Sequence, residues 1–255
     1  MKGLLSKEEY RNYCKRFKQV YLFLQSNSKP QSQVVKEICM IREYYPERMS
    51  SILSKAGFLF IEDDTCYEKL RNAGDDLGLF TDDGKFLLAG RYIFPVYDML
   101  GNIIALIGWY PDSKKYITTP SKLFSKSCLF YGIEQLSTTG INKNYVLVEG
   151  IFDCLSVRSL GIPCVAQMGI DSTRYKSAMY SLFSSLLAIP DNDSEGRGVI
   201  DYDKWSLPSN SKYLRWVGDS AKDIDKLCNT YEEDDVRELL LSAFSKRKRI
   251  IVEKL

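Results

Sequence analysis

Apolar residues recur every three or four positions in the first part of the chain, which is the spacing of one helical face. This spacing predicts a helix over residues 6–25, with Ser6 as its N-cap and Glu9 completing a capping box. Two further helices are predicted over residues 31–44 and 46–57, the second beginning at a proline and ending at a glycine. The chain therefore opens with a helical region.

The pattern changes twice further along the chain. Residues 61–90 are acidic and interrupted by glycines, which predicts a short helix and a loop, whereas the two apolar runs of residues 91–110 predict a β-hairpin. Beyond residue 140, β-rich runs alternate with helical segments, which predicts an α/β fold with a parallel sheet and crossover helices. The predicted strands are 145–148, 162–166, 185–189 and 212–217, and the helices between them are 151–160 and 172–184.

The composition excludes several kinds of active site. The 255 residues contain no histidine, which excludes Ser-His-Asp triads and histidine-bound zinc, and the seven cysteines include no C-x-x-C pair that would predict a zinc ribbon. No apolar run is long enough to cross a bilayer, and the N-terminus becomes charged before a signal sequence develops. We therefore expect a cytoplasmic protein with reduced thiols, no membrane association, and chemistry based on carboxylates, lysines or oxygen-bound metal ions.

Charge is unevenly distributed although the net charge is only +2. Residues 1–50 carry a net charge of +5 and residues 91–145 of +3, whereas residues 146–235 carry −6. Such blocks indicate an acidic metal-binding site and a surface suited to polyanions. On charge alone, chance clustering of solvated side chains is the better explanation.

Acidic residues follow three of the predicted strands. The carboxyl ends of parallel strands form the edge where active sites of open sheets lie. Five carboxylates at one edge would repel one another, and an all-oxygen set favours Mg²⁺ or Mn²⁺. For any one of these residues, capping of a helix is the better interpretation; for the whole set, the metal interpretation is better. The residues are Glu149, Asp191, Asp193, Asp223 and Asp225.

Two motifs in this region resemble those of a known domain. Glu149-Gly150-x-x-Asp153 follows one predicted strand, and Asp191-x-Asp193-x-x-Gly196 follows a later one, with Gly169 between them. Together they resemble the TOPRIM domain, which type IA and II topoisomerases, bacterial-type primases, small nucleases and recombination mediators share.

The residues upstream are similar to one of those families, the bacterial DnaG-type primase catalytic core. The similarity covers about residues 76–228. Its segments occur in the order of the family, namely Arg91–Val96, Gly101–Ile104 with Gly108, Lys115–Pro120, Leu123–Lys126 and Leu129–Gly132. The resemblance implies four regions: an N-terminal helical region (1–75), a basic primase-type α/β subdomain (76–140), a TOPRIM domain with a Rossmann-like parallel sheet (141–228), and a C-terminal helix with a basic tail (229–255).

The resemblance also implies roles for individual residues. Glu149, Asp191 and Asp193 are the expected catalytic residues, with Glu149 either a metal ligand or a general base. The expected metal ligands are these three together with Asp153, Asp223 and Asp225. The expected nucleic-acid or nucleotide contacts are Arg91, Lys115, Tyr116, Lys126 and Trp109, the last standing where the family usually has an arginine.

The function that follows is a DNA-dependent RNA primase core. It would take single-stranded DNA as template, NTPs as substrates and Mg²⁺ or Mn²⁺ as cofactor, without zinc. We expect a replicative helicase or another replisome protein as partner, in a bacterial or phage-infected cytoplasm. Two alternatives stay open, a TOPRIM-type nuclease that activates water and a non-catalytic replication or recombination mediator that binds nucleic acid.

Overall fold

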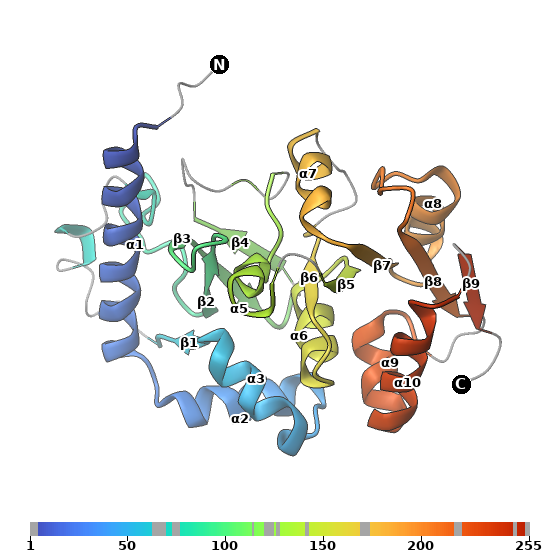
Figure 1. Cartoon of the computed structure of the whole chain (residues 1–255). Coiled ribbons are helices and arrows are strands. Elements are labelled where there is room, and N and C mark those ends of the chain that lie inside the picture. Colours follow the sequence, from blue (N-terminus) through green and yellow to red (C-terminus); the bar gives the residue numbers. More distant parts are fainter. Residues whose placement is uncertain are drawn as a thin grey trace. The chain divides into compact units, whose positions relative to one another are not determined.

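The chain forms two compact units, residues Met1–Ser125 and Lys126–Leu255, which are described separately (Figure 1). The computed structural model describes residues 5–62, 70–72, 77–113, 115–119, 125, 128–140, 143–168, 174–216, 221–246 and 249–252. Within these residues, no helix has the length and apolar character needed to cross a membrane.

The first unit packs helices on a small antiparallel sheet. Its strands lie in the order β1-β2-β3-β4. The helices are α1 (Lys7–Asn27), α2 (Gln31–Arg42) and α3 (Pro46–Ala56), and the strands are β1 (Leu59–Phe60), β2 (Tyr92–Tyr97), β3 (Ile103–Tyr110) and β4 (Lys115–Thr118).

Local signals explain these boundaries. The Ser6 hydroxyl accepts from the Glu9 amide at 3.2 Å while the Glu9 carboxylate accepts from the Ser6 amide at 2.7 Å, so the predicted capping box is confirmed. Gly57 ends α3 with a φ of 74°, a left-handed conformation that costs glycine little. In the hairpin turn, the Asp98 carboxylate accepts from the amides of Leu100 and Asn102 at 2.8 and 2.9 Å, which fixes the β2–β3 connection.

The core of the first unit includes side chains from α1 and the sheet. Phe17, Val20 and Leu24 of α1 belong to one buried cluster with Ile93 and Leu106 of the strands. The neighbouring residue Phe94 faces the opposite side, where its ring centroid lies 4.7 Å from that of Phe58. Both faces of the central hairpin are therefore covered.

The second unit is built on a five-stranded parallel sheet in the order β6-β5-β7-β8-β9. Helices α7 and α8 lie on one face of it, and α6, α9 and α10 lie on the other (Figure 1). The strands are β5 (Asn144–Val148), β6 (Cys164–Ala166), β7 (Ser185–Ile189), β8 (Lys212–Trp216) and β9 (Arg249–Val252). The helices are η2 (Ile133–Gln135), α5 (Leu136–Thr139), α6 (Ile151–Ser159), α7 (Arg174–Met179), η3 (Tyr180–Leu182), α8 (Ser194–Tyr202), α9 (Ile224–Thr230) and α10 (Glu233–Ala243).

The C-terminal part differs from the expectation in one respect. Helix α10 agrees with the predicted C-terminal helix, but the residues after it form the strand β9, which pairs in parallel with β8. The sequence analysis did not predict this strand, which forms because Ile250–Val252 is β-branched throughout and Ile250 is buried. The parallel sheet therefore continues beyond residue 228, where the TOPRIM-type region was expected to end.

Candidate functional site

The strand order places a switch point between β5 and β7. The chain crosses from β5 to β6 on one side, and β7 lies on the other side of β5. Ligands of open parallel sheets bind outside the carboxyl ends of the strands at such a point. Glu149 directly follows β5 and Asp191 follows β7, and the Asp191 amide donates to the Glu149 carboxylate at 3.1 Å. The structure thus brings these two predicted residues together.

The turn after β7 positions the next predicted carboxylate. Asp193 accepts from the Gly196 amide at 2.9 Å through its Oδ1, at the beginning of α8. A Cβ atom built on Gly196 would lie 1.8 Å from the backbone carbonyl oxygen of Asp191. No side chain fits in that space, so glycine is the residue that lets this turn close on itself.

The loop before α9 joins the same edge. Asp223 caps α9 by accepting from the Lys226 amide at 2.8 Å. The backbone of this loop meets the β7–α8 turn, since the Asn192 amide donates to the Lys222 carbonyl at 2.6 Å. Asp223 therefore lies near Asp191, as the strand-end pattern predicts.

Asp153 and Asp225 have different surroundings from the other four carboxylates. Asp153 is 9% exposed, and its two oxygens accept from the Gly150 amide at 3.0 Å and the Asp225 amide at 3.2 Å. Asp225 is buried and accepts from the Ser156 hydroxyl. These hydrogen bonds link α6 to α9. The motif alone did not predict this link, and Ser156 was not among the predicted site residues.

The electrostatics of the site reflect crowded negative charge. Burial, together with the like charges of Glu149, Asp223 and Asp193, raises the pKa of Asp191 to about 7, although Lys222 opposes the shift. Burial is also the main cause that raises the pKa of Asp153 well above its usual range. A divalent cation would relieve this repulsion, and the oxygen-only donors suit Mg²⁺ or Mn²⁺. In the described part of the chain, no three His, Cys, Asp or Glu side chains form a group that could hold a metal ion as they stand.

All of the predicted nucleic-acid contacts except Lys126 belong to the first unit. The Arg91 guanidinium lies over the Tyr110 ring, 5.5 Å from its centroid, and Lys115 stands opposite Tyr110 in the β3–β4 register. Lys115 is exposed and Tyr116 is half-buried. Tyr110 is 39% exposed and was not among the predicted nucleic-acid contacts. The sequence could have indicated it, because a residue two positions beyond Gly108 lies on the same face of β3 as Gly108.

Trp109 does not fit the role expected of it. It is 2% exposed, and its ring centroid lies 5.6 Å from that of Tyr92. It faces the opposite side of β3 from Tyr110, because successive residues of a strand alternate. The expectation of a nucleic-acid contact is therefore corrected to a core residue. Lys126 lies outside the described residues.

Comparison with known proteins gives the following relationships. Residues 146–228 match a family model described as Toprim-like. The chain is 28% identical over 152 residues to a DNA primase of Clostridium acetobutylicum and 30% identical over 158 residues to a DNA primase of Borreliella burgdorferi. These alignments cover 58% and 56% of this chain but 22% and 29% of those proteins. The chain thus spans less than a third of the length of these relatives.

Solved structures resemble nearly the whole chain. The DnaG primase catalytic domain bound to single-stranded DNA matches with a TM-score of 0.74 at 20% identity, covering 94% of this chain and 83% of that one. The zinc-binding and RNA polymerase domains of the Aquifex aeolicus primase match with a TM-score of 0.72 at 20% identity, covering 94% and 62%. At this level of identity, the matches show a shared fold.

Proposed function

We propose that this chain, which has the fold of a DnaG-type primase catalytic core and carries a Toprim-like domain, synthesises short RNA primers on single-stranded DNA. The observation that carries the proposal is the meeting of Glu149 and Asp191 at the switch point of the sheet. Asp193 and Asp223 stand beside them, and the charges of Glu149, Asp223 and Asp193 all act on Asp191. Crowded carboxylates at a strand-end edge are what metal-dependent nucleotidyl transfer requires.

The carboxylates fit a divalent cation by their chemistry. Glu149, Asp191 and Asp193 would hold Mg²⁺ or Mn²⁺, with Asp223 beside them. When bound, the ion would activate the attacking 3′-hydroxyl and neutralise the charge on the leaving pyrophosphate. Glu149 is fixed by the Asp191 amide, so its carboxylate is already oriented at the edge. Asp153 and Asp225, which link α6 to α9, would hold these helices in position rather than bind the metal ion directly.

Contacts with the template are proposed for the first unit. Arg91, Tyr110 and Lys115 combine cations for phosphates with a ring on which an unstacked base can lie. A structural relative is described as bound to single-stranded DNA, which supports the same ligand for this chain. NTPs as substrates, a replisome partner and a cytoplasmic location complete the proposal.

The experiment is incubation of the purified chain with single-stranded DNA, labelled NTPs and Mn²⁺ or Mg²⁺. Short RNA products that depend on both metal and template are the expected result. Shortening of the DNA would instead identify a nuclease. DNA binding without either product would identify a non-catalytic binding protein, and both of these results would contradict the proposal.

A further inference from the structure

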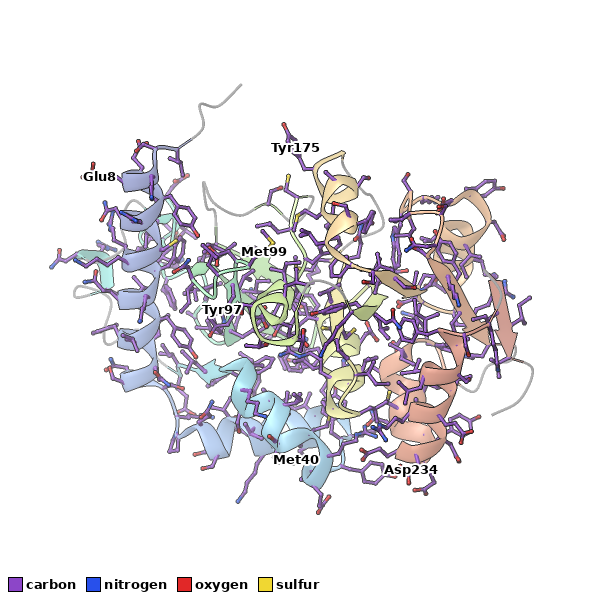
Figure 2. All side chains as sticks on the ribbon, viewed as in Figure 1. Glu8, Met40, Tyr97, Met99, Tyr175 and Asp234 are labelled. Carbon is purple, nitrogen blue, oxygen red and sulfur yellow. The ribbon has the colours of Figure 1, made fainter. Side chains whose placement is uncertain are left out.

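A buried lysine lies close to the candidate site without belonging to it. Lys176 of α7 is 1% exposed, whereas its neighbour Tyr175 is 58% exposed and points away from the helix into solvent (Figure 2). Lysine is almost never fully buried unless a partner compensates its charge. The interactions of Lys176 therefore require an explanation.

The ammonium group of Lys176 makes a hydrogen bond and a ring contact, and the Cys128 thiol lies near it. The ammonium group donates a hydrogen bond to the backbone carbonyl of Gln167 and lies over the Phe130 ring, 5.3 Å from its centroid. Gln167 is fully buried, so water cannot reach its carbonyl, and the lysine supplies a donor. The Gln167 side chain accepts one long hydrogen bond, from the Tyr180 hydroxyl to its Oε1 at 3.5 Å, whereas its Nε2 atom has no hydrogen-bond partner among the described residues.

Gln167 and Met168 form a turn that is hydrogen-bonded to the end of β5. The Gln167 amide donates to the Val148 carbonyl at 2.7 Å, and the Met168 amide donates to the Glu149 carbonyl at 2.8 Å. Met168 has a φ of 59°, a left-handed conformation that is unfavourable for a residue with a Cβ atom. Such a conformation persists only where its surroundings hold it. The backbone position of Glu149 therefore depends on what fixes this turn.

We propose that Lys176 is a positioning residue for Glu149, acting through the Gln167–Met168 turn. The inference rests on the proposed function, because it takes Glu149 as part of the metal site. Lys176 touches neither the carboxylates nor any reacting atom. Its hydrogen bond fixes the turn, the turn fixes the backbone of Glu149, and the backbone sets where the Glu149 carboxylate meets Asp191.

A role in stability alone does not explain a lysine at this place. Burial lowers the pKa of Lys176 to about 8, so the protein bears the cost of holding a cation away from water. An apolar side chain of the same length would avoid that cost. A positioning role explains why a lysine is present, because its ammonium group donates a directed hydrogen bond to the Gln167 carbonyl that an apolar side chain cannot make.

The test compares Lys176→Met with Tyr175→Met in the full chain. The first substitution removes the donor and keeps the length of the side chain, and the second places the same residue one position away on the solvent side. Mn²⁺ affinity by electron paramagnetic resonance, kcat and KM for primer synthesis, and the thermal midpoint are measured. We expect Lys176→Met to lower Mn²⁺ affinity and kcat by about three- to tenfold, with KM for NTPs and the thermal midpoint not impaired. Tyr175→Met should match the wild type.

The outcomes separate this inference from the proposed function. If the wild type makes primers but Lys176→Met has unchanged kcat and Mn²⁺ affinity, the positioning role is wrong and the function stands. If the wild type makes no primers, the function fails, and the Mn²⁺ affinities still decide the inference. The inference is also wrong if Lys176→Met and Tyr175→Met lose Mn²⁺ affinity and kcat equally, or if Lys176→Met loses them together with a lower thermal midpoint. Should Lys176→Met fail to fold, Lys176→Gln, which keeps a donor, is expected to lose less than threefold in Mn²⁺ affinity, and a loss above tenfold contradicts the proposal.

Discussion

At the scale of single residues, the buried charge of Lys176 predicts how stability depends on pH. Its pKa is about 8 in the folded protein against an ordinary 10.5, so between these values the unfolded chain holds a proton that the folded protein releases. Stability therefore rises with pH in this window, by about 2 kcal/mol between pH 7.5 and 9.5. Urea unfolding at both pH values should show this rise for the wild type relative to Lys176→Met. Equal pH dependence of the two proteins would contradict the assignment, and Cys128 is the titratable neighbour to vary as a control.

Lys115 allows a second prediction at this scale. Lys115 is exposed and pairs with Tyr110 at the end of the β3–β4 hairpin where residues 111–114 connect the two strands. If it binds a template phosphate, Lys115→Ala should weaken binding of single-stranded DNA and lower the slope of log affinity against log salt by about 0.7. Fluorescence anisotropy over a salt series measures the slope. Lys55→Ala, an exposed lysine of α3 in the same unit, serves as the control, and an identical slope in the two variants would exclude Lys115 from the interface.

At the scale of elements, the turn between β7 and α8 depends on a single glycine. Gly196→Ala would place a Cβ atom 1.8 Å from the Asp191 carbonyl oxygen, and the contact is with backbone, which cannot rotate away. We expect loss of Mn²⁺ binding and a loss of stability of about 3 kcal/mol or more, or failure to fold. Calorimetry and Mn²⁺ titration measure both.

Gly198→Ala is the matched control in the same helix. A Cβ atom there would lie 3.5 Å from the Lys204 Nζ, an ordinary contact. Alanine in a helix should raise stability by about 0.5–1 kcal/mol. If Gly196→Ala behaved like Gly198→Ala, the close approach in this turn would be disproved.

Local signals predicted most of the elements. The capping box of α1, Pro46 and Gly57 around α3, and the apolar runs of the hairpin are each readable within a few residues, and the structure confirms them. The strand β9 was missed because its four residues adjoin a basic run and its partner β8 lies more than thirty positions away.

The candidate site was predictable only in part, for a similar reason. The meeting of Glu149 and Asp191 follows from the topology of parallel strands, which the alternating pattern revealed. The inward turn of Asp153 and Asp225 and the burial of Trp109 depend on tertiary packing, which no motif encodes. The burial of Lys176 was not predicted either, because it too depends on tertiary packing.

At the scale of the whole molecule, we propose that the N-terminal helices bind a protein partner. Removing residues 1–57 would not test this cleanly, because Phe17, Val20 and Leu24 share a core with the β2–β3 hairpin. The corner between α2 and α3, where Met40 lies (Figure 2), is a better target. Met40 is 74% exposed and Tyr45 is 60% exposed. Ile41, next to Met40 in the sequence, is 41% exposed as well, and a cluster of exposed apolar side chains marks a protein contact.

We therefore expect the double substitution Met40→Ser and Tyr45→Ser to leave primer synthesis by the isolated chain unchanged. Stimulation by the replicative helicase of the same source should fall by about tenfold. Primer yield with and without the helicase measures both. Loss of unstimulated synthesis would mean that this corner serves the reaction or the fold, and full stimulation would place the partner surface elsewhere.

The metal-dependent site at the β5–β7 edge is tested by the rate of dinucleotide formation against Mn²⁺ concentration for the wild type, Asp191→Asn and Asp201→Asn. Asp191 lies at the switch point beside Glu149, whereas Asp201 is exposed on α8. We expect Asp191→Asn to lower the rate by at least about a thousandfold with DNA affinity unchanged, because the lost carboxylate acts on the transition state. Asp201→Asn should match the wild type. Wild-type rates and Mn²⁺ dependence in Asp191→Asn would contradict the metal-dependent site at the β5–β7 edge.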